Sequence, residues 1–152
     1  MLGHTYPGQN CSAARTLEIV GERWTLLILR DAMFRHYLRY TQFEESLGIA
    51  SNVLAKRLDG LVKSGLMETR GTGGHPSAGR LEYHLTQAGL EMKPVIMALT
   101  QWGDKWLGPG PVEFRHATGG DLVAVELRRA GGEAVGPAEV VARRREPTGQ
   151  NT

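Results

Sequence analysis

Apolar side chains recur every three or four residues in parts of the chain, a spacing that places them on one face of an α-helix. The stretches with this pattern are residues 13–33, 51–63 and 87–107. Gly21 is able to interrupt the first helix, and Pro94 and Gly103 are able to kink the last one. The chain is therefore predicted to be mainly α-helical.

Capping signals predict a further short helix, residues 41–47. Thr41 is expected to cap its first turn, with Glu44 as the second member of a capping box. Gly48 is able to take a positive φ and end this helix, and Ser51 is expected to cap the next one. Two helices joined by so short a turn are predicted to form a helix-turn-helix.

Two strand-like runs, residues 66–70 and 81–86, follow these helices and flank a segment rich in Gly, Ser and Pro. They predict a β-hairpin with a long, flexible tip. A helix, a helix-turn-helix and a hairpin in this order form a winged helix. The expected fold class is therefore mainly α with a small β-hairpin (α+β).

The rest of the chain differs in pattern from this winged helix, which is expected to occupy residues 1–107. Apolar residues alternate in residues 108–145, so a small β-rich appendix is expected there. Residues 146–152 have no apolar periodicity and are expected to be a disordered tail. The appendix is expected to be held by the packing of Val112, Phe114, Leu122, Val125 and Leu127.

The helix at residues 51–63 is expected to read DNA. With Leu54 directed inward, a rotation of about 100° per residue turns several polar side chains outward. These are Asn52, Lys56, Asp59 and Lys63. Asn pairs with adenine and Lys with guanine in the major groove, and Val53 would meet a thymine methyl group. A solvated face is the ordinary interpretation of such lysines alone, and their place in the motif favours DNA.

Neighbouring polar side chains are expected to contact the DNA backbone. Arg57 lies toward the core margin, where an internal salt bridge and a phosphate contact are equally favoured. Basic residues of the hairpin would lie over phosphates or enter the minor groove, although plain exposure is favoured for His75. The complete predicted DNA-binding set is Arg39, Thr41, Ser51, Asn52, Val53, Lys56, Arg57, Lys63, Arg70, His75 and Arg80.

Composition narrows the functional classes. The 152-residue chain has a formal charge of +2, which permits binding to a polyanion without requiring it. The chain has a single cysteine, Cys11, which excludes a disulfide framework and a multi-cysteine metal site. No run of residues resembles a signal peptide or a membrane span, so a cytoplasmic protein is expected. Catalytic motifs have no recognisable setting, and residues 71–74 lack the Lys-Ser/Thr of a phosphate loop. Neither an enzyme nor a cofactor is expected.

A specific string of residues begins at Cys11 and continues through Ala14-Arg15-Thr16-Leu17 and Gly21-Glu22-Arg23-Trp24-Thr25-Leu26-Leu27-Ile28-Leu29-Arg30-Asp31. Further matches are Ser46-Leu47-Gly48-Ile49, Asn52-Val53-Leu54, Glu82-Tyr83 and Gln101-Trp102-Gly103-Asp104. Over about residues 11–107 the chain resembles the HxlR family of bacterial regulators. The resemblance implies a homodimer that binds a palindromic operator on double-stranded DNA, with repression as the expected role.

The resemblance also implies how two subunits meet. In the family, the N-terminal helix and the long C-terminal helix pack across the two-fold axis. The residues that this arrangement places at the dimer interface are Leu17, Val20, Trp24, Met92, Ile96, Leu99, Trp102 and Trp106.

The chain departs from the family in its wing and its appendix. The usual Pro-Pro-Arg of the wing is replaced here by His75-Pro76-Ser77-Ala78-Gly79-Arg80, which predicts a more mobile tip. A subset of the family carries cysteines that look like a zinc-binding hairpin. Here Gly119-Gly120 stand where the first Cys-Gly would be, and Arg128 and Gly131-Gly132-Glu133 occupy the later pair. His116 alone cannot hold zinc. A degenerate zinc-ribbon-like hairpin without metal is expected.

Cys11 corresponds to a position where several family members carry a thiol that senses oxidants or electrophiles. An inert cysteine at the dimer interface is favoured over such a sensor. The alternative function is a ligand- or redox-responsive sensor, whose main activity is binding a small molecule or a protein. Its pocket would be lined by aromatic side chains, which at helical spacing more often belong to a core: Tyr37, Tyr40, Trp24, Trp102 and Trp106.

Overall fold

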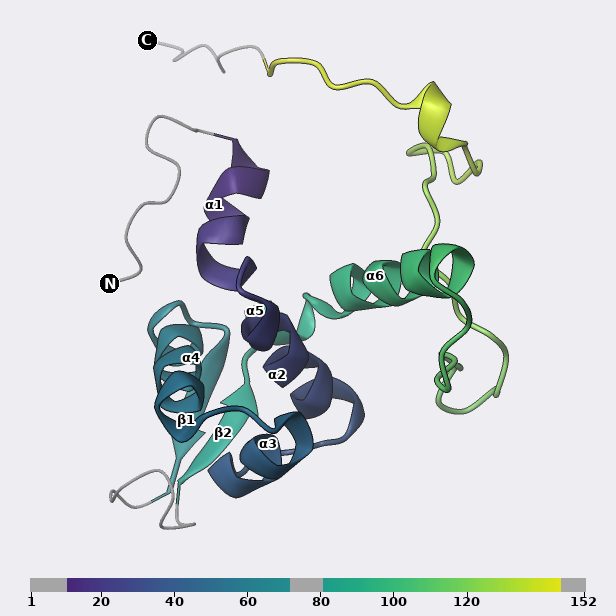
Figure 1. Cartoon of the computed structure of the whole chain (residues 1–152). Helices are drawn as coiled ribbons and strands as arrows, with labels where there is room; N and C mark the ends of the chain where they lie inside the picture. Colours follow the sequence, from purple (N-terminus) through teal and green to yellow (C-terminus); the bar gives the residue numbers. More distant parts are fainter. Residues whose placement is uncertain (1–10, 72–80, 146–152) are drawn as a thin grey trace, which may run out of the picture. The chain divides into compact units, whose positions relative to one another are not determined.

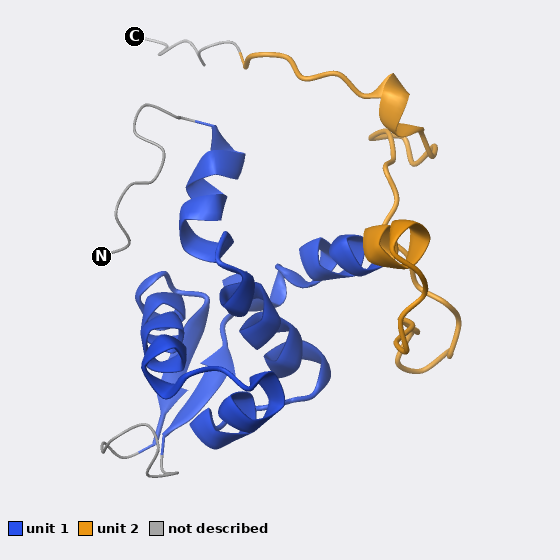
Figure 2. Cartoon of the chain, viewed as in Figure 1, with its two compact units in different colours: residues 1–100 blue, residues 101–152 orange. Residues whose placement is uncertain are grey.

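The computed structural model describes residues 11–71 and 81–145 of the chain (Figure 1). The chain divides into two units, residues 1–100 and residues 101–152 (Figure 2). The division falls within helix α6 (Lys93–Trp106), a little before the expected boundary after residue 107. The predictions for His75, Arg80 and the tail concern residues outside the described ranges.

Two helices replace the single helix expected over residues 13–33. Helix α1 (Ser12–Val20) ends at Gly21, and helix α2 (Arg23–Phe34) begins after Glu22. Gly21 donates its backbone N–H to the carbonyl of Leu17 at 2.8 Å, and a Cβ at this position would collide with the same oxygen. The close approach requires glycine, so Gly21 ends the helix instead of merely weakening it.

Helix α3 (Tyr40–Leu47) and helix α4 (Ser51–Lys63) form the predicted helix-turn-helix. The turn begins at Gly48, whose φ of 58° lies in the left-handed region, as expected. The two predicted caps are wrong. Gln42 Oε1 accepts hydrogen bonds from the backbone N–H groups of Leu38 and Arg39, so α3 starts before Thr41. Helix α4 is capped at Ala50, and Ser51 is already its first residue.

Strands β1 (Met67–Arg70) and β2 (Glu82–Leu85) form an antiparallel hairpin, in which Met67 pairs with Leu85 and Arg70 with Glu82. The hairpin packs against α4 through β1 and against α2 through β2 (Figure 1). The tip of the predicted wing, residues 72–80, lies outside the described residues. The helix-turn-helix followed by this hairpin is a winged-helix arrangement.

The helix expected over residues 87–107 is also divided, into α5 (Gln87–Leu90) and α6 (Lys93–Trp106). Thr86 caps α5, because its Oγ1 accepts a hydrogen bond from the backbone N–H of Gly89 at 3.2 Å. Pro94 is the second residue of α6, where its missing N–H has no intrahelical partner to lose. The break therefore precedes Pro94, and the proline begins a helix rather than kinking one.

The hydrophobic core of the first unit is formed by the inward faces of α2, α3, α4 and the hairpin, with Val20 of α1 and Ile96 of α6 added. Its fully buried apolar side chains are Ile28, Leu29, Phe43, Leu54, Leu58, Leu61 and Met67. The α4 members recur every three or four residues, as the apolar pattern predicted. This packing leaves the opposite face of α4 exposed.

A buried carboxylate connects α2 to α3. Asp31 is fully buried, and it accepts hydrogen bonds from Arg30 Nε at 2.8 Å and Ser46 Oγ at 2.7 Å. Arg35 Nε lies 3.6 Å from the same carboxylate. Charge-assisted hydrogen bonds of this kind hold the first helix of the helix-turn-helix at a fixed position on α2.

In residues 108–145, β structure is limited to isolated bridges, Arg115 with Leu122 and Arg128 with Ala134, followed by a 3-10 turn at Pro137–Glu139. The packing expected there is wrong for Val112, Leu122 and Leu127, which are exposed. Arginines hold these turns instead. Arg115 Nη1 donates to the carbonyl of Gly120 at 2.6 Å, and Arg128 Nη1 donates to that of Gly132 at 2.7 Å.

Among the described residues, no helix is long and apolar enough to cross a membrane. The same part of the chain contains no group of three or more His, Cys, Asp or Glu side chains that could hold a metal ion.

Candidate nucleic-acid interface

The outward face of α4 carries the two side chains expected to read bases. Leu54 and Leu58 are fully buried, and this orientation leaves Asn52 and Lys56 exposed in the first turns of the helix. Within the described part of the chain, Lys56 forms no ion pair and Asn52 no side-chain hydrogen bond. Among residues 11–71 and 81–145, neither side chain has a partner that would compete with a ligand.

The other lysine of this face is already paired. Lys63 Nζ lies 2.7 Å from Asp59 Oδ2, one helical turn away in the last turn of α4. A lysine near the C-terminal end of a helix is also favoured by the helix dipole. Lys63 therefore has a role within the helix, whereas Lys56 has none.

The start of α4 is fixed by a tyrosine of α3. Tyr40 is buried, and its hydroxyl donates to the carbonyl of Ser51 at 2.5 Å. Ser51 Oγ lies 2.7 Å from Tyr40 Oη, so the serine hydroxyl is turned toward this tyrosine and not toward the helix end. Val53 is half-buried and packs against the core, with part of its side chain exposed beside Asn52.

A second buried tyrosine, Tyr83, lies on strand β2. Tyr83 of β2 is buried, and this burial raises the pKa of its phenol, with Tyr40 and Asp59 adding smaller contributions in the same direction. The neutral phenol is therefore favoured in the folded protein. Neither tyrosine was singled out as part of the interface from the sequence, because tyrosines at helical or strand spacing are ordinary core residues.

Arg57 forms the internal salt bridge that was one of its two expected roles. Its Nη2 lies 3.1 Å from Glu22 Oε2, and its side chain is only 13% exposed. Glu22 is the N-cap residue of α2 and follows Gly21, so this ion pair connects α4 to the junction between α1 and α2. Arg57 Nε is buried without a hydrogen-bond partner in the described structure.

Arg39 and Thr41 are exposed at the start of α3. Arg39 Nη2 lies 3.8 Å from Glu82 Oε1, and these two residues also form an isolated β-bridge. The bridge joins the helix-turn-helix to the wing. Arg70, at the end of β1, is exposed, and its Nη2 donates a hydrogen bond to Glu68 Oε1 at 2.6 Å.

The residues expected at a dimer interface fall into two groups. Val20 and Ile96 are buried in the core of their own chain and cannot form a surface, and Trp24 and Met92 are half-buried against that core. The remaining members are large, exposed apolar side chains: Leu17, Leu99, Trp102 and Trp106. Sequence periodicity marked all of these residues as apolar helix positions, but it does not distinguish a core face from a subunit face.

Cys11 is exposed and caps helix α1, since its Sγ accepts a hydrogen bond from the backbone N–H of Ala14 at 3.3 Å. Arg15, one helical turn further along α1, donates to Ser12 Oγ at 3.3 Å. A sensing role for this thiol stays a prediction.

The helix-turn-helix, the exposed face of α4 and the hairpin define a winged helix-turn-helix protein. A family model described as HxlR-like helix-turn-helix matches residues 19–111. The chain belongs to this family of transcriptional regulators, as the sequence resemblance indicated.

Known relatives and structures agree with this assignment. The uncharacterized HTH-type transcriptional regulator Rv3095 of Mycobacterium tuberculosis is 44% identical over 124 residues, which cover 79% of this chain and 75% of the relative. The crystal structure of PA1607, a candidate transcription factor, has a TM-score of 0.78 at 30% identity and covers 91% of this chain and 97% of that one. PA1374 from Pseudomonas aeruginosa, also a candidate transcription factor, has a TM-score of 0.62 at 32% identity, covering 93% and 96% of the two chains.

Proposed function

We propose that this regulator binds a palindromic operator as a homodimer and represses transcription there, with Asn52 and Lys56 reading bases in the major groove. The observation that carries the proposal is the exposed, unpaired pair of side chains at the start of α4. Their types suit adenine and guanine, respectively. In winged helix-turn-helix proteins the first turns of the recognition helix contact base edges.

The backbone contacts would come from the surroundings of α4. Thr41 and Arg39 at the start of α3, and Arg70 at the end of β1, are exposed polar groups next to the motif. Phosphate contacts of this kind fix the register of the protein on the duplex without reading its sequence. Arg57 is not part of this set, because its side chain is only 13% exposed and is paired with Glu22.

The proposal is tested with an operator selected from random DNA by the full-length protein, and with two matched lysine variants. Lys56→Ala is expected to weaken binding to the selected site by about 1–3 kcal/mol and to relax the base preference. Lys63→Ala serves as the control, because that lysine is already paired with Asp59 at 2.7 Å. Fluorescence anisotropy measures both affinities. Equal affinities of wild type and Lys56→Ala for the site would contradict this placement of the reading face.

The homodimer is supported by exposed apolar side chains on α6. Val95, Leu99, Trp102 and Trp106 follow one another at intervals of four, three and four residues along this helix, and all are exposed. Large apolar patches on a monomer commonly mark an interface. A two-fold dimer would place two α4 helices about 34–36 Å apart, one turn of the duplex.

Trp102→Glu tests the dimer, because it introduces a charge among these side chains. The variant is expected to be monomeric by sedimentation equilibrium, with an unchanged far-ultraviolet circular dichroism spectrum. The operator affinity of the variant should also be lower than that of wild type, since each monomer then binds only one half-site. A wild-type protein that sediments as a monomer at micromolar concentration would contradict the proposed assembly. Repression is tested separately, with a reporter gene placed behind the selected operator.

A further inference from the structure

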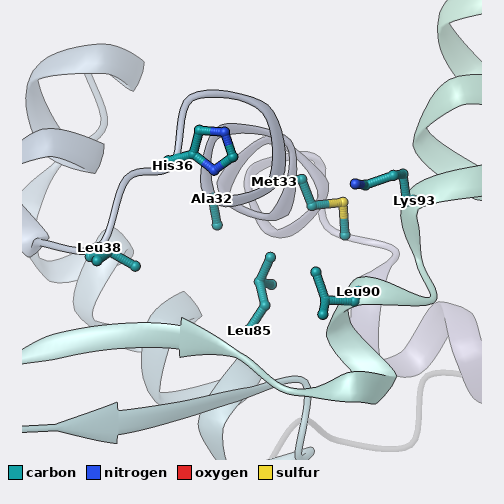
Figure 3. A pocket seen from close by; sticks show the side chains of 7 residues that line it. All are labelled: Ala32, Met33, His36, Leu38, Leu85, Leu90 and Lys93. Carbon is teal, nitrogen blue, oxygen red and sulfur yellow. The ribbon is translucent and has the colours of Figure 1, made fainter. Parts of the chain in front are cut away.

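A cavity of about 330 Å³ opens in the first unit between the end of α2, the loop that follows it, strand β2 and helix α5 (Figure 3). Apolar side chains, among them Met33, Leu85 and Leu90, make up most of its lining, and two nitrogen-bearing side chains, His36 and Lys93, complete it. The volume lies at the lower end of the range of roughly 300–1,000 Å³ typical of small-molecule pockets. It is not the aromatic pocket considered from the sequence.

The charge of the cavity has one sign. Lys93 is half-buried as the first residue of α6, and its Nζ lies 5.6 Å from the centroid of the Phe34 ring. Cation–π attraction holds the ammonium group near this ring, and Figure 3 shows it directed toward Met33. The lining contains no carboxylate, and in the described part of the chain Lys93 has no ion-pair partner.

His36 stands at the rim of the cavity in an unusual backbone conformation. Its φ of 56° makes it the single non-glycine residue with a positive φ among residues 11–71 and 81–145. A side chain with a Cβ rarely adopts this region unless its surroundings require it, and such residues concentrate at ligand sites. Here the conformation places the imidazole above Ala32, where the ring faces the cavity (Figure 3).

We propose that this cavity binds a small organic monoanion, a carboxylate attached to an aromatic ring or a branched alkyl group. The carboxylate faces Lys93 Nζ, with the imidazole of His36 as a second hydrogen-bond donor. The apolar body of the ligand contacts Met33, Leu85 and Leu90. A single fixed cation within an apolar lining suits one negative charge, and the apolar walls disfavour a highly hydrated ligand such as inorganic phosphate.

The position of the cavity gives the ligand a regulatory role, and this part rests on the proposed function. His36 lies in the loop between α2 and α3, and Lys93 begins α6. An occupant therefore contacts both the loop that leads into the DNA-reading motif and the helix that carries the proposed dimer face. A ligand that favours one arrangement of these elements changes operator affinity through its differential binding to the two arrangements.

The binding step is tested without DNA, by NMR titration of the isotope-labelled full-length protein with benzoate and with benzamide, its neutral analogue. Benzoate is expected to bind saturably, with a Kd of about 1 mM or lower, and to shift the signals of Met33, Leu85 and Leu90. Benzamide should bind about tenfold more weakly or worse, because it lacks the charge.

Two variants identify the site. Lys93→Met should raise the Kd for benzoate about tenfold. Lys105→Met is the matched control, since Lys105 Nζ also lies over an aromatic ring, 5.1 Å from the centroid of Trp106, but does not line the cavity. Leu90→Trp, which fills the cavity from a partly exposed position, should abolish binding. A thermal melt of each variant confirms that it folds.

The proposal is overturned if benzamide binds as tightly as benzoate, if Lys93→Met binds benzoate like wild type, or if neither probe binds saturably. The regulatory part is tested by operator affinity with and without benzoate, where a change in wild type that Lys93→Met lacks is expected. An operator affinity that benzoate leaves unchanged removes the regulatory part. A protein that selects no operator contradicts the proposed function, and the titration still decides whether the cavity binds the anion.

Discussion

Replacing Glu22 with glutamine should destabilise the protein, because it removes the charge that pairs with Arg57 of α4. Glu22 is the partner of Arg57, at 3.1 Å, and the two side chains are 58% and 13% exposed. Removing one partner of a buried pair costs about 3–5 kcal/mol, whereas exposed pairs contribute about 0–1 kcal/mol. Because solvent reaches Glu22 but hardly reaches Arg57, we expect Glu22→Gln to lower the free energy of unfolding by about 1–2 kcal/mol.

Arg57→Met should remove the destabilisation that Glu22→Gln causes. The substitution keeps the aliphatic stem and removes both the charge and the buried Nε that lacks an acceptor. Buried ion pairs replaced by apolar side chains are often neutral or stabilising. In the Arg57→Met background, Glu22→Gln should therefore change stability by less than about 0.5 kcal/mol.

The assay is a double-mutant cycle by urea unfolding, followed by far-ultraviolet circular dichroism. The control cycle uses Asp59→Asn and Lys63→Met, an exposed pair at 2.7 Å for which a coupling of about 0.3–0.5 kcal/mol is expected. Operator binding is measured against salt in parallel, and Arg57→Met should leave the slope unchanged. A slope reduced by about one, together with no coupling between Glu22 and Arg57, would show that Arg57 neutralises a phosphate instead.

Four further substitutions test features that hold the proposed interface in place. Gly48 has a φ of 58°, so Gly48→Ala should lower the free energy of unfolding by about 1 kcal/mol in the same urea assay. Gly60→Ala within α4 should raise it by about 0.5–1 kcal/mol, because an added Cβ meets nothing within 4 Å there. Asp31→Asn should lower stability by about 3 kcal/mol, because it removes the buried charge that accepts a hydrogen bond from Arg30 Nε at 2.8 Å. The unfolding midpoint measures this change, and a change below about 1 kcal/mol would contradict the role of Asp31. Burial raises the pKa of Tyr83 above its ordinary value of 10.0, so the contribution of this phenol to stability should be constant below pH 10 and be lost as the pH rises through the folded-state pKa. Tyr83→Phe should remove this part of the decline in unfolding curves recorded across that range, and an identical decline in the variant would contradict the assignment.

The sequence alone determined the elements whose signals are local. The spacing of Leu54, Leu58 and Leu61 fixed both the helix and the face of α4 that points outward, because a helix with one apolar stripe can bury only that stripe. Gly48 marked the turn, since few other residues adopt its backbone conformation without strain. Together these signals were enough to predict the winged helix and to place Asn52 and Lys56 on its exposed face.

The tertiary structure determined where helices end and which side chains pair, because both depend on residues distant in the sequence. The apolar pattern continues across the breaks after Val20 and after Leu90, and only the packed fold shows where each helix stops. Arg57 received its partner from the junction between α1 and α2, and the ring of Phe34 came to lie beside Lys93. Periodicity identifies an apolar face but not what covers it, because burial is a property of the folded chain and not of any one segment.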